Sequence, residues 1–347
     1  MIPDEKIDEL RKELDECSKP LIFFDDDCDG LASFVLLYRY KREGKGVPIK
    51  AAPTLNENFL KYVETYGPDK IFVLDNSRIS EEFVAKAKTK IICLDHHPYE
   101  RLDGVKYYNP KDFDETITWP TSYWAYKIAS KENNEDIWIG MLGCIGDWFM
   151  PDFKDEFCEL YPDLMDKSIE KPDDALFHSE IGRLAQAFYF VLKGSTKIVL
   201  SCMKILTRID SPYEILEQKT PQGKYIYKHY DKVLKHYNKL LSMAKKSVTE
   251  DRIIVFTYDH DNTSMTAEVS NELIHTYPEK IVVVGRRKNG EYRCSIRSAG
   301  ETLVAPALEK ILESIDGYGG GHDHACGAAI KEEDFGRFIE MLRDEFR

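Results

Sequence analysis

The chain has 347 residues, of which 43% are hydrophobic and 31% are charged, a composition that fits a folded globular protein and excludes a disordered one. This length suits two domains. The net charge of −13 argues against a generally basic nucleic-acid binder, although residues 224–246 hold seven lysines against one acid and residues 286–297 hold five basic residues against one acid.

The first residues predict an amphipathic charged helix and lack the apolar core of a signal peptide. Apolar runs such as residues 280–285 are far shorter than the roughly 20 residues that cross a bilayer. We therefore expect a cytoplasmic protein with no membrane association. The eight cysteines form no C-x-x-C pair, which argues against a zinc knuckle or a disulfide scaffold.

The first 150 residues alternate short apolar runs with helical patterns. The runs at 20–24, 70–74 and 90–94 are almost continuously apolar, as expected for strands that are buried on both faces. Residues 31–43 and 79–88 have helical spacing. This alternation predicts an α/β fold with a parallel sheet that helices cover on both faces.

Each of these three strands is followed or ended by an acid: Asp25, Asp75 and Asp95. In open parallel sheets, ligands bind at the carboxyl ends of the strands. We therefore expect these three carboxylates to converge in space.

The rest of the chain divides into a helical segment and a second α/β unit. Residues from about 155 to 247 have no strand-like alternation, and the lysine-rich part is expected to be a connecting helix whose lysines form a solvated face. Strands are predicted at 252–258, 280–286 and 292–298, and helices near 266–276, 303–314 and 333–346. The predicted domains are 1–155, 156–247 and 248–347.

Five motifs follow one another in the chain: "DDDCDG" (25–30), "LDNS" (74–77), "LDHHP" (94–98), "GCIGDW" (143–148) and "GYGGGHDHACGAAI" (317–330). Together they resemble the DHH phosphoesterase superfamily, and within it the compact archaeal type of RecJ-like single-strand exonuclease. The resemblance implies a DHH catalytic core with a parallel sheet, a helical connector and a smaller C-terminal DHH-associated domain that binds substrate.

The acidic motifs supply ligands for hard divalent cations, which prefer carboxylate oxygens. The inventory for two Mn²⁺ or Mg²⁺ ions is Asp25, Asp27, Asp29, Asp75, His96 and Asp147. Asp75 stands alone at its strand end and is the natural bridge between two ions. In an extended segment Asp25, Asp27 and Asp29 would share one face, with Asp26 and Cys28 on the other.

The remaining candidate residues face the substrate. The resemblance gives His97 a contact with the scissile phosphate, and Asp95 could orient an imidazole. In the C-terminal domain, Ser295 and Arg297 match positions where relatives grip phosphate. Gly319, Gly320 and Gly321 would let backbone N–H groups approach an anion beside His322. Asp323 and His324 are interpreted as a surface loop.

The predicted activity is two-metal hydrolysis that trims single-stranded DNA or RNA. The open alternatives are an oligoribonuclease or cyclic-dinucleotide phosphodiesterase, a pyrophosphatase, and a replication or repair scaffold related to RecJ. Expected partners are the single-stranded substrate and replication or repair helicase or primase proteins. A homo-oligomer is also left open.

Overall fold

The computed structural model describes residues 3–50, 54–130, 134–259 and 263–347. Its internal contacts divide the chain into two compact units, Met1–Tyr230 and Asp231–Arg347. The division falls inside one long helix, α12 (Pro221–Lys246), whereas the sequence placed the start of the last domain at residue 248. No helix in the described part of the chain is long and apolar enough to cross a membrane.

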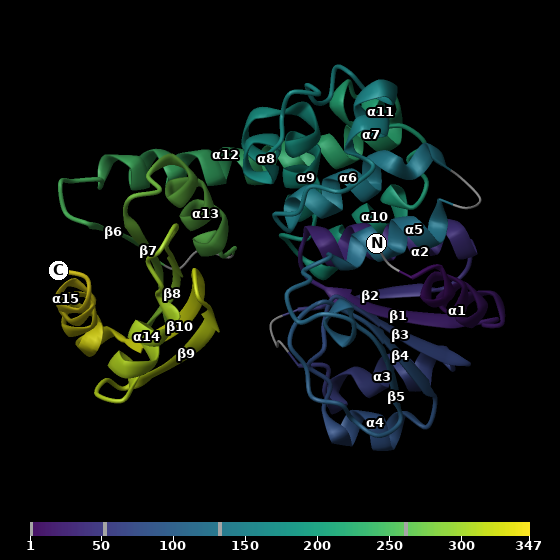
Figure 1. Ribbon diagram of the computed structural model, residues 1–347, viewed down its shortest axis with the longest axis horizontal. Coiled ribbons are helices and arrows are strands. Elements are labelled where there is room, and N and C mark those ends of the chain that lie inside the picture. The colour runs from purple at the N-terminus through teal and green to yellow at the C-terminus, as the bar shows by residue number, and fades with distance from the viewer. Residues whose placement is uncertain (1–2, 51–53, 131–133, 260–262) are drawn as a thin grey trace. The chain divides into compact units, whose positions relative to one another are not determined.

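The first unit is built on a parallel sheet, which confirms the predicted α/β class (Figure 1). Among the described residues, the strand order is β2-β1-β3-β4-β5 and every neighbouring pair is parallel. The strands are β1 (Pro20–Asp25), β2 (Lys45–Ile49), β3 (Lys70–Leu74), β4 (Lys90–Leu94) and β5 (Val105–Tyr108). The sequence predicted β1, β3 and β4, and it missed the less apolar edge strands β2 and β5.

Successive side chains of β1 point to opposite faces of the sheet, and both faces are buried. Phe23 packs on one face with Phe83, their ring centroids 5.8 Å apart. Phe24 packs on the other face, where it stacks on Phe34 at 4.9 Å. Burying one such side chain is worth about 1.5–3 kcal/mol, so the two layers explain why the strands are apolar throughout.

Helices cover the two faces as predicted (Figure 1). On one side lie α3 (Leu60–Tyr66) and α4 (Glu81–Ala87), and on the other side lie α2 (Cys28–Lys41), α5 (Thr121–Ala129) and α6 (Ile137–Gly146). The remaining helices of this unit are α1 (Asp4–Asp15), α7 (Lys154–Leu160), α8 (Pro172–His178), α9 (Glu180–Val191), α10 (Thr196–Leu206) and α11 (Pro212–Leu216). Residues 156–247, all described, form helices and no strand, as the sequence predicted.

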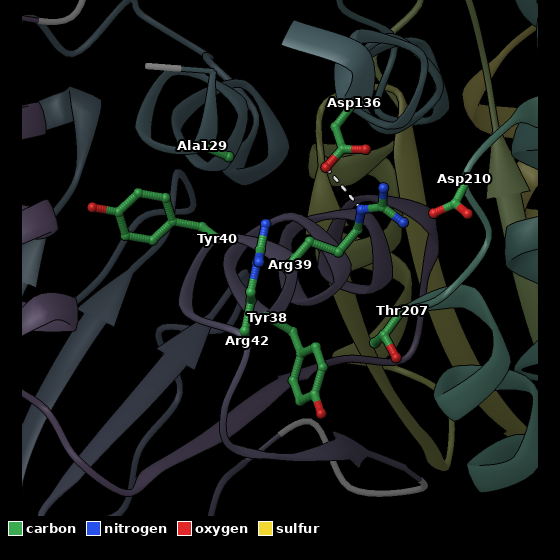
Figure 2. A pocket seen from close by; sticks show the side chains of 8 residues that line it. All are labelled: Tyr38, Arg39, Tyr40, Arg42, Ala129, Asp136, Thr207 and Asp210. Atoms are coloured by element: carbon green, nitrogen blue, oxygen red, sulfur yellow. Dashed lines mark hydrogen bonds and ion pairs between the residues drawn. The ribbon is translucent and has the colours of Figure 1, made fainter. Parts of the chain in front are cut away.

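A buried ion pair joins the C-terminal end of α2 to the start of α6 (Figure 2). Nε of Arg39 lies 2.8 Å from Oδ2 of Asp136, and Nη1 of Arg39 donates to the carbonyl of Ile209. The pair borders a pocket of about 550 Å³ that Tyr38 and Arg42 also line. The acidic motif lies at the N-terminal end of α2. This ion pair therefore holds the other end of α2 against α6.

The second unit has a mixed sheet of order β6-β7-β8-β10-β9 among the described residues, in which only β6 and β7 run parallel. Its strands are β6 (Ile253–Tyr258), β7 (Ile281–Lys288), β8 (Glu291–Arg297), β9 (Gly317–His322) and β10 (Ala325–Lys331). Its helices are α13 (Thr266–Thr276), α14 (Ala305–Leu312) and α15 (Phe335–Glu345). The sequence predicted all of these elements except β9 and β10.

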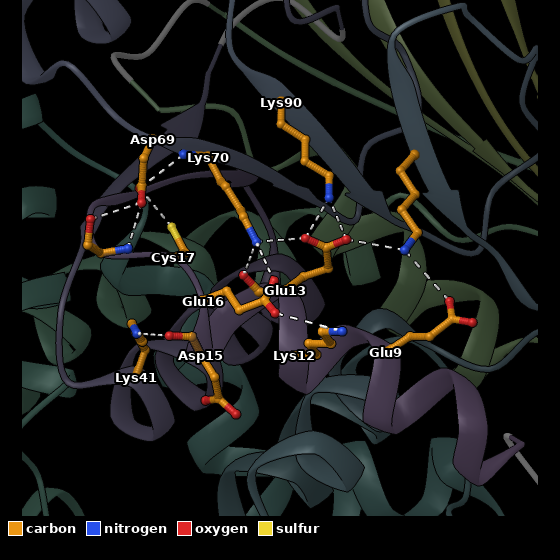
Figure 3. A network of polar contacts seen from close by, with 12 residues as sticks. Glu9, Lys12, Glu13, Asp15, Glu16, Cys17, Lys41, Asp69, Lys70 and Lys90 are labelled. Carbon is orange, nitrogen blue, oxygen red and sulfur yellow. Dashed lines mark hydrogen bonds and ion pairs between the residues drawn. The ribbon is translucent and has the colours of Figure 1, made fainter.

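A cluster of charges around Glu13 attaches helix α1 to the sheet (Figure 3). The buried carboxylate of Glu13 lies within 2.7 Å of the Lys70 ammonium, 2.6 Å of the Lys90 ammonium and 3.2 Å of the Lys106 ammonium. Burial opposes the charged form, but the three ammonium groups outweigh it and lower the pKa of Glu13 from 4.5 to about 2.

We predict that Glu13→Gln lowers the free energy of unfolding at neutral pH by roughly 1–3 kcal/mol, because three lysines lose the negative charge that they share. The folded pKa lies below the ordinary value of 4.5, so this stability is fully present above about pH 4.5 and is lost as pH falls towards 2. Urea unfolding of wild type and variant at several pH values measures this difference in the free energy of unfolding. The gap between wild type and variant should shrink with acidification, and a gap independent of pH would contradict the assignment.

The matched control is Glu16→Gln. The Glu16 side chain is 57% exposed and lies 3.9 Å from the Lys70 ammonium. Because exposed ion pairs contribute little, this variant should change the free energy of unfolding by less than about 1 kcal/mol at any pH.

Candidate active site

The first acidic motif is a strand-to-helix turn. Strand β1 ends at Asp25 and α2 begins at Cys28, with Asp27 as the N-cap residue whose carboxylate accepts from the backbone N–H of Gly30 at 2.9 Å. A Cβ at Gly30 would lie 2.6 Å from the Asp25 carbonyl oxygen, so only glycine allows this tight turn. The prediction of an extended segment through Asp29 was wrong, because Asp29 lies in the first helical turn.

Asp29 is held by the start of another helix. Its two carboxylate oxygens accept from the backbone N–H groups of Thr121 at 2.8 Å and Ser122 at 2.7 Å, the first residues of α5. A helix N-terminus carries free N–H donors and a partial positive charge, so it stabilises this buried carboxylate. Neither residue was predicted to belong to the site; "WPTS", with proline directly before them, was the available helix-start signal.

Asp75 follows β3 in a left-handed backbone conformation, with φ of 58°. Residues other than glycine rarely adopt this backbone conformation, which costs on the order of 1 kcal/mol or more. The hydrogen bond from its backbone N–H to the Leu94 carbonyl helps to hold it there. Its side chain is buried, and Oδ2 has no hydrogen-bond partner among the described residues.

The two histidines of the "LDHHP" motif lie side by side just beyond β4, which ends at Leu94. Their ring centroids are 4.3 Å apart. Nε2 of His96 lies 3.3 Å from Oδ1 of Asp75 and 3.4 Å from Oδ2 of Asp147. Because the strand has already ended, both rings reach the same acidic cluster.

Asp95 fixes His97 rather than joining the acidic cluster. Oδ1 of Asp95 lies 2.9 Å from Nδ1 of His97, and its Oδ2 accepts from the His97 backbone N–H at 3.1 Å. The side chain of Asn109, directly after β5, donates to the His97 carbonyl at 2.9 Å. Sequence reasoning did not single out Asn109, whose only signal is its place after an unpredicted strand.

All six candidate metal ligands belong to overlapping groups of three, in which one ligand atom of each residue lies within 4.8 Å of the others. Asp75 and His96 each occur in two groups, and His97 occurs in one. The groups are Asp25 with Asp27 and Asp75, Asp29 with His96 and Asp147, and Asp75 with His96 and His97. Residues from separate segments of the sequence therefore form one cluster.

The cluster carries more buried negative charge than the surrounding protein neutralises. Burial, followed by the charge of Asp27, raises the pKa of Asp25 to about 7 and that of Asp29 to about 7. Burial, with the charges of Asp29 and Asp27, also raises the pKa of Asp75 and Asp147. This excess, together with the unpartnered Oδ2 of Asp75, fits one or two divalent cations bound among the carboxylates.

Asp26 points to a different partner. Its Oδ1 lies 3.3 Å from the Lys50 ammonium, directly beyond β2, and it belongs to none of the three groups. Asp26 thus differs from its neighbours in role, although its carboxylate is part of the same acidic motif.

In the second unit, the glycine run forms the edge strand β9, an element that was not predicted. A Cβ at Gly319 would lie 2.6 Å from the Gly327 carbonyl oxygen, and one at Gly321 would lie 2.3 Å from that of Ala325, so close pairing with β10 requires both glycines. A Cβ at Gly320, by contrast, would meet no atom within 4 Å. Asp323 and His324 form the turn that joins the two strands.

The candidate substrate-binding residues Ser295, Arg297, Gly320 and His322 lie on one face of this sheet, in two adjacent rows of cross-strand neighbours. Ser295, Gly327 and Gly320 are direct neighbours across β8, β10 and β9, and Arg297, Ala325 and His322 form the next row. Ser295 Oγ donates to Thr266 Oγ1 at 3.0 Å.

Arg297 is oriented by its hydrogen bonds. Its Nε donates to Asn271 Oδ1 at 2.7 Å, and its Nη1 donates to the Cys326 carbonyl at 3.3 Å. The planar donors of a guanidinium can fork onto a phosphate group, and the neighbouring row of the sheet is open at Gly320.

We predict that Asp27→Asn abolishes stabilisation of the fold by Mn²⁺, whereas Asp26→Asn retains it. Both variants remove one charge from the same turn, and asparagine keeps an oxygen that can cap α2. Thermal unfolding with Mn²⁺ and with a chelator measures the shift that a ligand of the native state produces. Equal loss of the shift in both variants would show that the two carboxylates are assigned wrongly.

Comparisons with known proteins agree with this organisation. Residues 19–145 match the DHH family, N-terminal domain, and residues 235–347 match the DHHA1 domain. No curated protein sequence matches the chain.

Solved structures show the same fold at low sequence identity. The chain resembles RecJ in complex with Mn²⁺ from Thermus thermophilus, with a TM-score of 0.68 and 15% sequence identity. The match covers 98% of this chain but only 54% of RecJ, so this chain spans about half the length of that protein. It also resembles exonuclease RecJ bound to manganese, with a TM-score of 0.61 and 13% sequence identity. That match covers 98% of this chain and 93% of the other. A third similar structure is the pGpG-specific phosphodiesterase PggH from Vibrio cholerae, with a TM-score of 0.52 and 12% sequence identity. That match covers 94% of this chain and 98% of the other. With a DHH domain followed by a DHHA1 domain in a RecJ-like fold, the chain belongs to the DHH family of phosphoesterases.

Proposed function

We propose that the chain is a metal-dependent phosphodiesterase, a RecJ-like exonuclease that trims single-stranded DNA or RNA. The observation that carries this proposal is the cluster of Asp25, Asp27, Asp29, Asp75, His96 and Asp147 in three overlapping groups. Five carboxylates and one imidazole suit Mn²⁺ or Mg²⁺, and Mn²⁺ accepts the imidazole more readily.

In this proposal the cluster holds the cations, and Asp75 and Asp29 have distinct places in it. Two bound cations would supply an acidified water and neutralise charge on the phosphoryl oxygens. Asp75, which belongs to two of the groups, would hold a cation together with residues of either group. Asp29 has its orientation set by the N-terminus of α5, so its carboxylate is positioned before any ion arrives.

His97 is proposed to donate a hydrogen bond to the scissile phosphate. Burial lowers the pKa of His97, but the hydrogen bond and charge of Asp95 outweigh this and raise it to about 9. The interaction with Asp95 therefore favours the protonated ring. Asp95 and Asn109 hold it in place, so it can stabilise charge that develops on the phosphate in the transition state.

Substrate binding is proposed for the DHHA1 domain. The Arg297 guanidinium, with the open strip at Gly320, would bind a phosphate or a terminal nucleotide, and His322 lies in the same row as Arg297. The relatives named RecJ support a nucleic-acid substrate for this chain. Association with replication or repair helicase or primase proteins stays a prediction from the resemblance.

The direct test is Mn²⁺-dependent cleavage of single-stranded DNA and RNA labelled at the 5′ or the 3′ end. Wild type should shorten these strands from one end. Asp75→Asn should lose more than the roughly 10–100-fold that removal of an outer-shell partner of a metal site typically costs, because Asp75 itself would hold the ions. Asparagine also tolerates the left-handed backbone at this position.

Asp26→Asn is the matched control, and it should keep most of the wild-type rate. No cleavage of any strand by wild type, or full activity in Asp75→Asn, would remove the proposal. The end from which the label is lost gives the polarity of digestion.

A second candidate is hydrolysis of very short substrates, which is favoured by the likeness to a pGpG-specific phosphodiesterase that the chain covers almost completely. The two functions share the metal cluster and differ in the length of strand that they accept. We expect a higher kcat/KM on strands of about 20 nucleotides than on a dinucleotide, because backbone contacts beyond the first phosphates add affinity. A strong preference for the dinucleotide would establish the second candidate instead.

A further inference from the structure

A groove runs along the edge strand β2, outside the acidic cluster. It has a volume of about 450 Å³, and residues of β2, of the segment Asn56–Tyr62 and of α10 line it. Among the described strands, β2 pairs only with β1, so its outer edge faces this groove. A five-residue strand is roughly 16 Å long, so the groove suits an extended segment better than a single small ion.

The lining is basic although the chain as a whole is strongly acidic. Lys45, Lys50 and Lys61 line the groove, and none of the described residues that line it is an acid. Glu57, which lies next to lining residues in the sequence, is exposed and is not part of the lining. A stretch of this kind on a protein of net charge −13 concentrates positive potential along one path.

Aromatic rings lie between these lysines. The Lys45 ammonium lies 5.5 Å from the ring centre of Tyr62, and the Lys61 ammonium lies 5.2 Å from the same ring. The rings of Phe59 and Tyr62 are 6.2 Å apart, and both are half-buried. Lysines for the phosphates and flat rings for the bases are the two components of a surface that binds single strands without sequence preference.

One end of the groove adjoins the first acidic motif. Ile49, the last residue of β2, pairs with Asp25. Lys50 follows, and its ammonium meets Asp26 at 3.3 Å and also donates to the Leu192 carbonyl. The groove therefore leads from the turn that carries Asp25 and Asp27 to Lys45 at the far end of β2.

We propose that this groove binds the phosphate backbone of a single-stranded nucleic acid whose end lies at the acidic cluster. The proposal deepens the function proposed above, and rests on it in taking nucleic acid as the substrate. An added protein strand is the competing occupant of a sheet edge, but Pro48 removes a backbone donor from β2, and the lysine-rich lining matches a polyanion.

The test measures binding apart from turnover. The double variant Lys45→Glu/Lys61→Glu is compared with wild type by fluorescence anisotropy, using labelled oligothymidylate of about 20 nucleotides at several salt concentrations. The Kd should rise at least about 10-fold near 0.1 M salt, and the slope of log K against log salt should become shallower by about 1.4, since each phosphate contact contributes roughly 0.7 on single strands. Thermal unfolding of both proteins checks that the fold is intact.

Lys86→Glu/Lys88→Glu is the matched control. Both lysines are exposed in the first unit, lie outside the groove lining and make the same change of charge. The control should shift the Kd less than about threefold and leave the slope unchanged, because neither lysine lines the groove.

The result is separable from that of the proposed function. Manganese-dependent hydrolysis of bis(p-nitrophenyl) phosphate by wild type reports on the metal cluster alone. If that hydrolysis is present while Kd and slope are the same in the groove variant and wild type, the groove proposal is overturned and the function stands. If hydrolysis is absent while the groove variant alone loses affinity, the groove binds nucleic acid and the catalytic proposal fails.

Discussion

The structure depends on the mutual repulsion of carboxylates that the fold collects at one edge of a parallel sheet. Asp25, Asp29, Asp75 and Asp147 all have a raised pKa because they are withdrawn from water and lie near other carboxylates. A fold tolerates such a cluster only if cations neutralise it or if protons bind. The helix N-terminus at Asp29 offsets part of the charge, and bound cations would offset the rest.

Most of the framework that carries this cluster was predictable from periodicity. Continuous apolar runs indicate β1, β3 and β4, and their order in the sheet brings Asp75 close to Asp25, as the rule for parallel strand ends predicted. Strands β2 and β5 were missed because glycine and proline interrupt the first and a lysine interrupts the second. Asp147 lies at the end of a helix, so the motif resemblance and not the strand rule singled it out.

The contributions that the sequence did not reveal come mainly from backbone groups. Thr121 and Ser122 bind Asp29 through N–H donors, which every residue except proline carries. In the DHHA1 domain, an edge strand with a glycine run has almost no side chains to give a period, so β9 was not predicted. Its pairing with β10 fixes the two rows that hold Ser295 and Arg297.

The edge of the first sheet has a further consequence for how the protein behaves at high concentration. An unpaired strand can template addition of another chain and start aggregation, and natural proteins prevent this with lysine and proline on the edge. Lys45 and Pro48 place both on β2. Leucine in place of the edge lysines would add apolar surface beside Leu200, which is 46% exposed, and would favour association of these edges.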